Sequence, residues 1–174
     1  MITPAYCALM ARYNAWQNAE LVKSLEILSE ADLRAERGAF FGSIFKTVNH
    51  LLWGDTLWIS RFDGGSGPAE TDLTKTDTTD TTDSLAQWSA ERSVADARFI
   101  AWADRVSEAD LQGDLTWFSG SIQADISKSR PLCIMQMFNH QTHHRGQVHT
   151  MLGAAGAPMY TTDIPFIPSS FMPE

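Results

Sequence analysis

The sequence has few cysteines and no long apolar run. Its two cysteines, Cys7 and Cys133, lie far apart in a chain of 174 residues, which does not fit a disulfide framework. No apolar stretch approaches the roughly 18 residues that a membrane-spanning helix needs. The N-terminus lacks the basic segment and apolar run of a signal peptide. We therefore expect a cytoplasmic protein with two free, buried thiols.

The sequence also lacks an excess of positive charge. Its 13 lysines and arginines are outnumbered by 21 aspartates and glutamates, which gives a net charge of −8. No basic stripe is visible, and this argues against nucleic-acid binding through the phosphate backbone. No Ser/His/Asp triad, phosphate-binding loop or CxxC pattern is present. The 44% hydrophobic content is enough for a real core, so we expect one domain over residues 1–174.

Apolar residues recur at helical spacing in four long segments. Helices are predicted over residues 4 to about 28, 43 to about 62, about 84 to 106, and 131 to about 155. Alternating apolar and polar residues over 111–128 predict a small β-hairpin before the last helix. The proline-rich tail, 159–174, is apolar enough to pack back on the body through Ile164, Phe166, Ile167, Phe171 and Met172. The predicted fold class is all-α, a four-helix bundle.

Residues 63–83 form a long crossover loop between the second and third predicted helices. The segment begins with several glycines and continues as a run dominated by Thr and Asp. A loop of this length can act as a lid over a site, or it can connect two helices across the solvated surface. General loop behaviour favours the solvated crossover.

The last predicted helix carries four of the five histidines. His140 and His144 are four residues apart, so both side chains leave the same helix face. They belong to one core ladder: Cys133, Met137, His140, His144, Val148, Met151 and Ala155. His143 and His149 point away from this ladder and are interpreted as surface groups or as partners of ligands.

Two imidazoles in a core ladder allow two interpretations. Hydrogen bonds from neighbouring groups can satisfy both rings, or a transition metal can bind one nitrogen of each. The spacing leaves both open. His50 is the one histidine outside the last helix, and its helical pattern allows an inward position without requiring it. Asp55 is a fallback ligand or an acceptor for an imidazole N–H, although an ordinary helix-surface carboxylate is the favoured interpretation.

The last predicted helix carries other residues that bear on the same site. Arg145 can bind a substrate carboxylate, but a salt bridge to a neighbouring helix is the favoured prediction. Gly146 costs the helix about 1 kcal/mol relative to Ala, and we expect a close helix approach there in return. Gln147 lies near His140 on the helical wheel and is expected to orient a ligand. For Cys133, buried packing is favoured over a reactive thiol.

Three stretches resemble the DinB/YfiT-like family. They are Tyr13–Asn18, Asn49–Trp58 and Asn139–Gln147, which read YNAWQN, NHLLWGDTLW and NHQTHHRGQ. The third is the most specific, and the order of elements matches over essentially the whole chain. The resemblance implies an up-down-down-up four-helix bundle with a long crossover loop and a small hairpin before the last long helix. It also implies a divalent metal ion, zinc or nickel, bound by His50, His140 and His144.

The resemblance also bears on function. Some relatives resemble metal-dependent transferases that use low-molecular-weight thiols such as bacillithiol, mycothiol or glutathione, while many others have no established activity. The expected function is therefore a metal-dependent thiol transferase or related enzyme acting on a small molecule. The alternative is a non-catalytic, metal-stabilised bundle. The resemblance further points to a homodimer.

Overall fold

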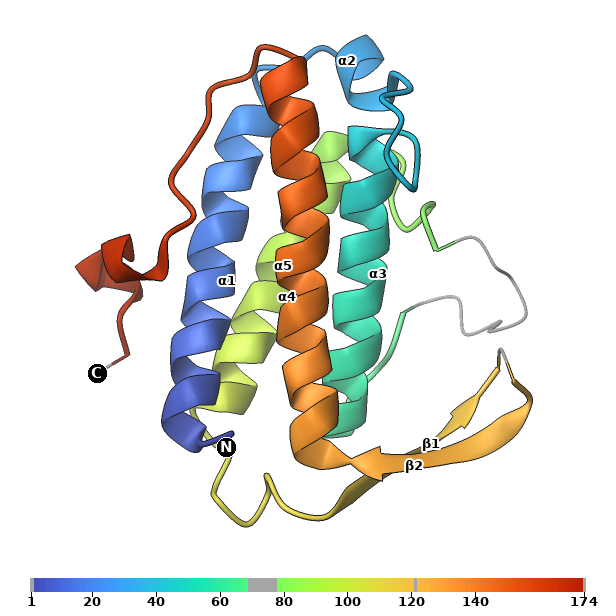
Figure 1. Ribbon diagram of the computed structural model, residues 1–174, viewed down its shortest axis with the longest axis vertical. Coiled ribbons are helices and arrows are strands. Elements are labelled where there is room, and N and C mark those ends of the chain that lie inside the picture. The colour runs from blue at the N-terminus through green and yellow to red at the C-terminus, as the bar shows by residue number, and fades with distance from the viewer. Residues whose placement is uncertain (1, 69–77, 121, 174) are drawn as a thin grey trace.

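The computed structural model describes residues 2–68, 78–120 and 122–173 (Figure 1). This part of the chain is mostly helical, with five α-helices and one small antiparallel sheet. The helices are α1 (Pro4–Leu25), α2 (Glu30–Arg34), α3 (Ile44–Asp63), α4 (Leu85–Ala103) and α5 (Arg130–Ala154). The strands are β1 (Asp114–Ser119) and β2 (Ala124–Ser129). All four long predicted helices are present, with ends that differ from the predicted ones by up to three residues.

Side-chain caps fix where the long helices begin. Thr3, Ser43 and Ser84 each accept a hydrogen bond from the backbone N–H three residues later, at 3.1 to 3.2 Å. Gly64 ends α3 in the left-handed conformation, with a φ of 74°. A glycine takes this conformation without the steric cost of a Cβ atom, so α3 stops there rather than running into the crossover.

The four long helices bury their apolar faces against one another. Helix α1 packs on α4, and α3 packs on both α4 and α5. The apolar core has two parts, one around Trp16 and Phe138 and the other around Leu52 and Trp88. Among the described residues, no helix is both long and apolar enough to cross a membrane.

The predicted hairpin is confirmed as β1 and β2. Trp117 of β1 faces Ile126 of β2 across the sheet. The indole of Trp117 meets the Trp58 ring edge-on, with ring centroids 5.8 Å apart. The guanidinium of Arg61 lies 4.8 Å from the centroids of both rings. The hairpin is therefore attached to α3 near the end at which α5 begins.

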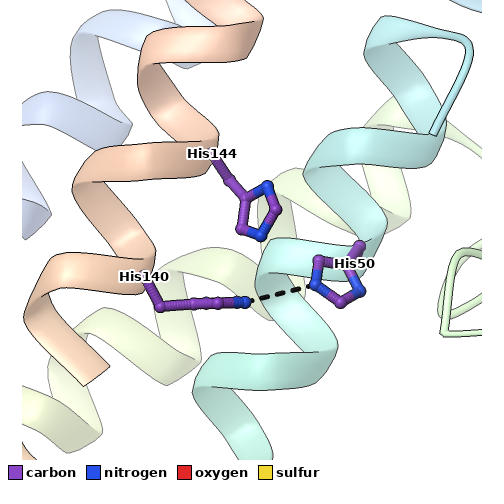
Figure 2. A group of neighbouring side chains, drawn as sticks. All are labelled: His50, His140 and His144. Atoms are coloured by element: carbon purple, nitrogen blue, oxygen red, sulfur yellow. Dashed lines mark hydrogen bonds between the residues drawn. The ribbon is translucent and has the colours of Figure 1, made fainter. Parts of the chain in front are cut away.

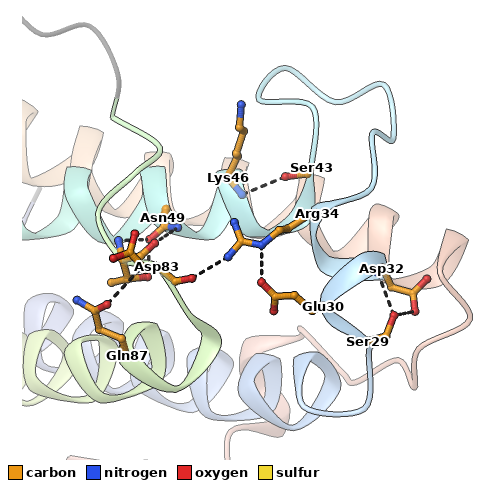
Figure 3. A network of polar contacts seen from close by, with 10 residues as sticks. Ser29, Glu30, Asp32, Arg34, Ser43, Lys46, Asn49, Asp83 and Gln87 are labelled. Atoms are coloured by element: carbon orange, nitrogen blue, oxygen red, sulfur yellow. Dashed lines mark hydrogen bonds and ion pairs between the residues drawn. The ribbon is translucent and has the colours of Figure 1, made fainter.

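The far end of the crossover is tied to α3 (Figure 3). The amide oxygen of Asn49 accepts hydrogen bonds from the backbone N–H and the hydroxyl of Thr82, at 3.0 and 2.8 Å. The hydroxyl of Thr81 donates to the carbonyl of Asn49 at 3.2 Å. Arg34 of α2 donates to the carbonyl of Asp83 at 2.7 Å. The Asn49 contacts hold residues 81 and 82 against α3, and the Arg34 contact ties Asp83 to α2.

The tail follows the sequence-based expectation only in part. Ile167 and Phe171 pack against the core, as predicted. Ile164, Phe166 and Met172 are exposed, so the prediction that they pack back is wrong. The tail contains two short 3-10 turns, Ile164–Phe166 and Ser169–Phe171, and all three residues of the first turn are exposed.

Candidate metal centre

Three histidines from two helices meet between α3 and α5 (Figure 2). His50 comes from α3, and His140 and His144 come from successive turns of α5. One ring nitrogen of each lies within 4.8 Å of the others. The Nε2 atoms of His50 and His140 are 3.2 Å apart. The structure therefore brings together the three histidines singled out from the sequence.

Hydrogen bonds on the outer side of two rings determine which nitrogen faces the centre. The hydroxyl oxygen of Thr78 lies 2.6 Å from Nδ1 of His50. The amide oxygen of Gln147 lies 2.8 Å from Nδ1 of His144 and accepts its proton. Because Nδ1 is engaged in both rings, Nε2 is the nitrogen left for the centre, an arrangement common to metal-binding histidines. Gln147, which was expected near His140, therefore hydrogen-bonds His144 instead, and its role in orienting a ligand stays a prediction.

Burial keeps the three imidazoles neutral. Desolvation, reinforced by the neighbouring imidazoles, lowers the pKa of His50 to about 3 and that of His140 to about 4. Burial also lowers the pKa of His144. Neutral imidazole is the form that binds zinc and other transition metals. The donor set therefore fits a divalent transition-metal ion. The Nδ1 of His140 is buried without a hydrogen-bond partner.

A glycine in α3 makes room for His140. A Cβ atom at Gly54 would lie 2.9 Å from Cε1 of His140. The sequence predicts such a close approach at Gly146, where an added Cβ would meet no atom within 4 Å. That prediction is wrong because Gly146 lies on an exposed face of α5. The close approach of α3 and α5 occurs at the triad.

Aromatic side chains border the triad. The Phe41 ring lies 4.1 Å from the His50 ring and 5.5 Å from the His144 ring, measured between centroids. The Trp53 ring stacks on His50 at 6.3 Å. These rings displace water from the imidazoles, which accounts for part of the desolvation that lowers their pKa values.

Asp55 is fully buried, so its interpretation as a surface carboxylate is wrong. Its Oδ2 accepts a hydrogen bond from Nη1 of Arg92 at 2.6 Å, and Nη2 of Arg92 lies 2.9 Å from Oδ1 of Asp96. Desolvation raises the pKa of Asp55, and the charge of Arg92 opposes that shift. Asp55 thus joins α3 to α4 and does not act as a fourth ligand.

Arg145 is also buried, but without the predicted salt bridge. Its guanidinium lies 5.6 Å from the centroid of the Tyr13 ring, and Nη1 and Nη2 have no hydrogen-bond partner. Among the described residues, no ion pair involves Arg145. Cys133 is buried, as predicted.

The other two histidines of α5 lie outside the triad. His143 is exposed and its Nε2 lies 3.2 Å from the amide nitrogen of Gln147. Nε2 of His149 lies 3.1 Å from the carbonyl oxygen of Tyr160 and donates to it. Both positions agree with the helical-wheel argument.

The family comparison agrees with this geometry. The model of the DinB family matches residues 1–171. The chain belongs to the DinB family. A comparison with curated proteins found no match to this DinB chain. The helical fold with its small antiparallel sheet is consistent with the DinB fold, and the three histidines can hold a metal ion.

Three residues around the DinB triad were missed by the sequence analysis. Gly54 carried a usable signal, because a glycine inside an apolar helix indicates a close approach. Thr78 is one threonine in a run of similar residues, and Phe41 lies in a loop without periodicity, so neither had a signal. The interpretation of the 63–83 crossover as a lid concerns mainly residues 69–77, which lie outside the described residues.

Proposed function

We propose that this DinB protein binds one divalent transition-metal ion, Zn²⁺ or Ni²⁺, through His50, His140 and His144. We further propose that it catalyses the transfer of a low-molecular-weight thiol to a small electrophile. The observation that carries the proposal is the convergence of three neutral imidazoles, two of them held by hydrogen bonds at Nδ1. Three neutral ligands preserve the full +2 charge of an ion and leave part of its coordination sphere for other molecules.

The proposed reaction joins a thiol R–SH to a substrate R′–X and yields R–S–R′ and HX. When bound, the metal ion supplies Lewis acidity that lowers the pKa of the thiol. The sulfur–carbon bond forms, the carbon–X bond breaks, and X leaves with the bonding pair and takes up the thiol proton. Thr78 and Gln147 keep two imidazoles in place. Phe41 covers the His50 ring and limits access of water.

We also infer that α1, α3, α4 and α5 form an up-down-down-up four-helix bundle. The packing of α1 on α4, and of α3 on α4 and α5, supports this course of the chain. In such a bundle the ligands project inward from facing helices, which is a common way to build a metal site. The homodimer stays a prediction, and sedimentation velocity of the purified protein tests it.

Metal analysis and thermal-shift measurements test the proposed function together. We expect about one zinc or nickel ion per chain as purified, and an increase in Tm when thiols are added to the metal-loaded protein. His144→Ala should abolish the metal, with His143→Ala as the matched control that retains it. Unchanged metal content in His144→Ala contradicts the ligand assignment. Metal without any response to thiols or electrophiles contradicts the transferase and leaves a metal-stabilised bundle.

A further inference from the structure

The loop between α2 and α3 carries two adjacent phenylalanines beside the triad. Phe41 contacts the rings of His50 and His144, as described above. Phe40 meets the Phe41 ring edge-on at 4.8 Å and is 83% exposed. No other large apolar side chain among the described residues has so large an exposed fraction. An aromatic surface therefore runs from the imidazoles outward into solvent.

The loop that carries Phe40 is closed by backbone hydrogen bonds. The N–H of Arg37 donates to the carbonyl of Gly42, and the N–H of Gly42 donates to the carbonyl of Ala39, each at 2.8 Å. Ala39 packs against the core. Gly38 and Gly42 take φ values of 72° and 79°, in the left-handed region that favours glycine. These bonds place Phe40 in the middle of a closed turn, where its side chain is exposed.

A second aromatic ring reaches the same imidazole from a different element. Trp53 of α3 stacks on His50 with an angle of 22° between the rings, and Phe41 lies on His50 with an angle of 32°. Phe41 and Trp53 thus both contact the ring of a proposed metal ligand, and Phe40 extends the Phe41 side of it into solvent. Isolated apolar residues are common on protein surfaces, but contiguous apolar surface next to a polar site is typical of ligand-binding grooves.

We propose that Phe40, Phe41 and Trp53 form the recognition surface for an aromatic or bulky apolar group on the electrophilic substrate. This inference rests on the proposed function, because it assumes that the reacting atom lies near the triad. Low-molecular-weight thiols such as glutathione are polar, so the apolar surface suits the second substrate and not the thiol. Aromatic rings prefer offset or edge-on contacts with one another, and the projecting Phe40 ring can make either.

The experiment uses cobalt-loaded protein and two thiols of similar acidity. Benzyl mercaptan combines a sulfur atom and a phenyl ring in one small probe, and 2-mercaptoethanol has the sulfur without the ring. Coordination of the thiol sulfur to cobalt produces a near-ultraviolet absorption band. Titrating this band gives the Kd for each of the two thiols. We expect the full chain to bind benzyl mercaptan at least about tenfold more tightly, which corresponds to about 1.4 kcal/mol. Phe40→Ser should reduce that ratio about three- to tenfold, within the range of one aromatic contact.

Phe166→Ser is the matched control, since Phe166 is 67% exposed on the tail and should leave the ratio unchanged. An unchanged ratio in cobalt-loaded Phe40→Ser overturns the proposal. If Phe40→Ser instead lowers the sedimentation coefficient and leaves the ratio unchanged, the surface binds a second copy of the chain, and the proposal is again overturned.

The failure of the proposed function is separable from the failure of this inference. If the protein binds no cobalt, the proposed metal site is contradicted. The aromatic surface is then tested separately by NMR of metal-free protein mixed with benzyl alcohol. Nuclear Overhauser contacts between the benzyl ring and the Phe40 or Trp53 ring would support the recognition surface. Their absence at saturating benzyl alcohol would overturn it.

Discussion

Gly54 of α3 lies so close to His140 of α5 that a Cβ atom there would be 2.9 Å from the imidazole Cε1. This contact couples the packing of two helices to the position of a proposed ligand. Only a residue without a side chain allows α3 to lie this close to His140 of α5. The cost of a glycine inside a helix is thus offset by the placement of His140.

The first prediction is that Gly54→Ala weakens metal binding by about tenfold or more, the size of effect seen when groups supporting a metal ligand are disturbed. The added methyl group displaces the His140 ring, because real Cβ contacts do not occur at this distance. Metal affinity measured by competition with a chelator tests this outcome.

Gly146→Ala is the control for that substitution. An added Cβ at Gly146 meets nothing within 4 Å, so the change should stabilise α5 by up to about 1 kcal/mol and leave metal affinity unchanged. Equal metal affinities for the two variants and the unsubstituted protein would show that Gly54 has no role in positioning His140.

The second prediction concerns the hydroxyl of Thr78. Thr78→Val keeps the shape of the side chain but removes the group that lies 2.6 Å from Nδ1 of His50. We expect metal affinity to fall about tenfold, since partners of ligand histidines typically contribute ten- to hundredfold. Thr81→Val serves as the control, because Thr81 bonds a backbone carbonyl of α3 and no histidine. Isothermal titration calorimetry with Zn²⁺ measures the affinity of each variant. Equal affinities for Thr78→Val and Thr81→Val would contradict the role of Thr78 in positioning His50.

The third prediction concerns the buried ion pair of Asp55 and Arg92. Asp55→Ala leaves the Arg92 charge buried without this partner, so the free energy of unfolding should fall by about 3–5 kcal/mol. Asp63→Ala also removes a carboxylate of α3 that pairs with an arginine, Arg98, but at a partly exposed position. That pair should contribute about 1 kcal/mol or less. Urea denaturation of both variants is the measurement, and similar losses would contradict the buried-pair account.

Part of the histidine triad could be predicted from the sequence alone. Spacing on α5 placed His140 and His144 on one face, because helical periodicity relates residues four apart in any helix. His50 needed the family motif, since periodicity on α3 did not fix its direction. The long helices followed from the same periodicity, and Ser43 and Ser84, at the starts of two predicted helices, are N-caps in the structure.

Contacts between distant segments could not be read from the same patterns. The burial of Asp55 depends on Arg92, which lies 37 positions later on another helix. Gly54 and Gly146 look alike in sequence, and only the packing of α3 on α5 distinguishes a crowded glycine from an exposed one. Thr78 contacts His50 from a segment with no periodic pattern at all.

The fourth prediction is that neither cysteine reacts rapidly with a disulfide reagent such as DTNB in the folded protein at pH 8. Both thiols are buried, and desolvation raises the pKa of Cys7 to about 11. At pH 8 only about one Cys7 thiol in a thousand is then ionised, and the thiolate is the reactive form. Burial also raises the pKa of Cys133, against the opposing charge of Arg61. Guanidinium chloride should release two reactive thiols per chain. Fast reaction of one thiol without denaturant would contradict the packing of Cys7 or Cys133, and single serine substitutions would identify which.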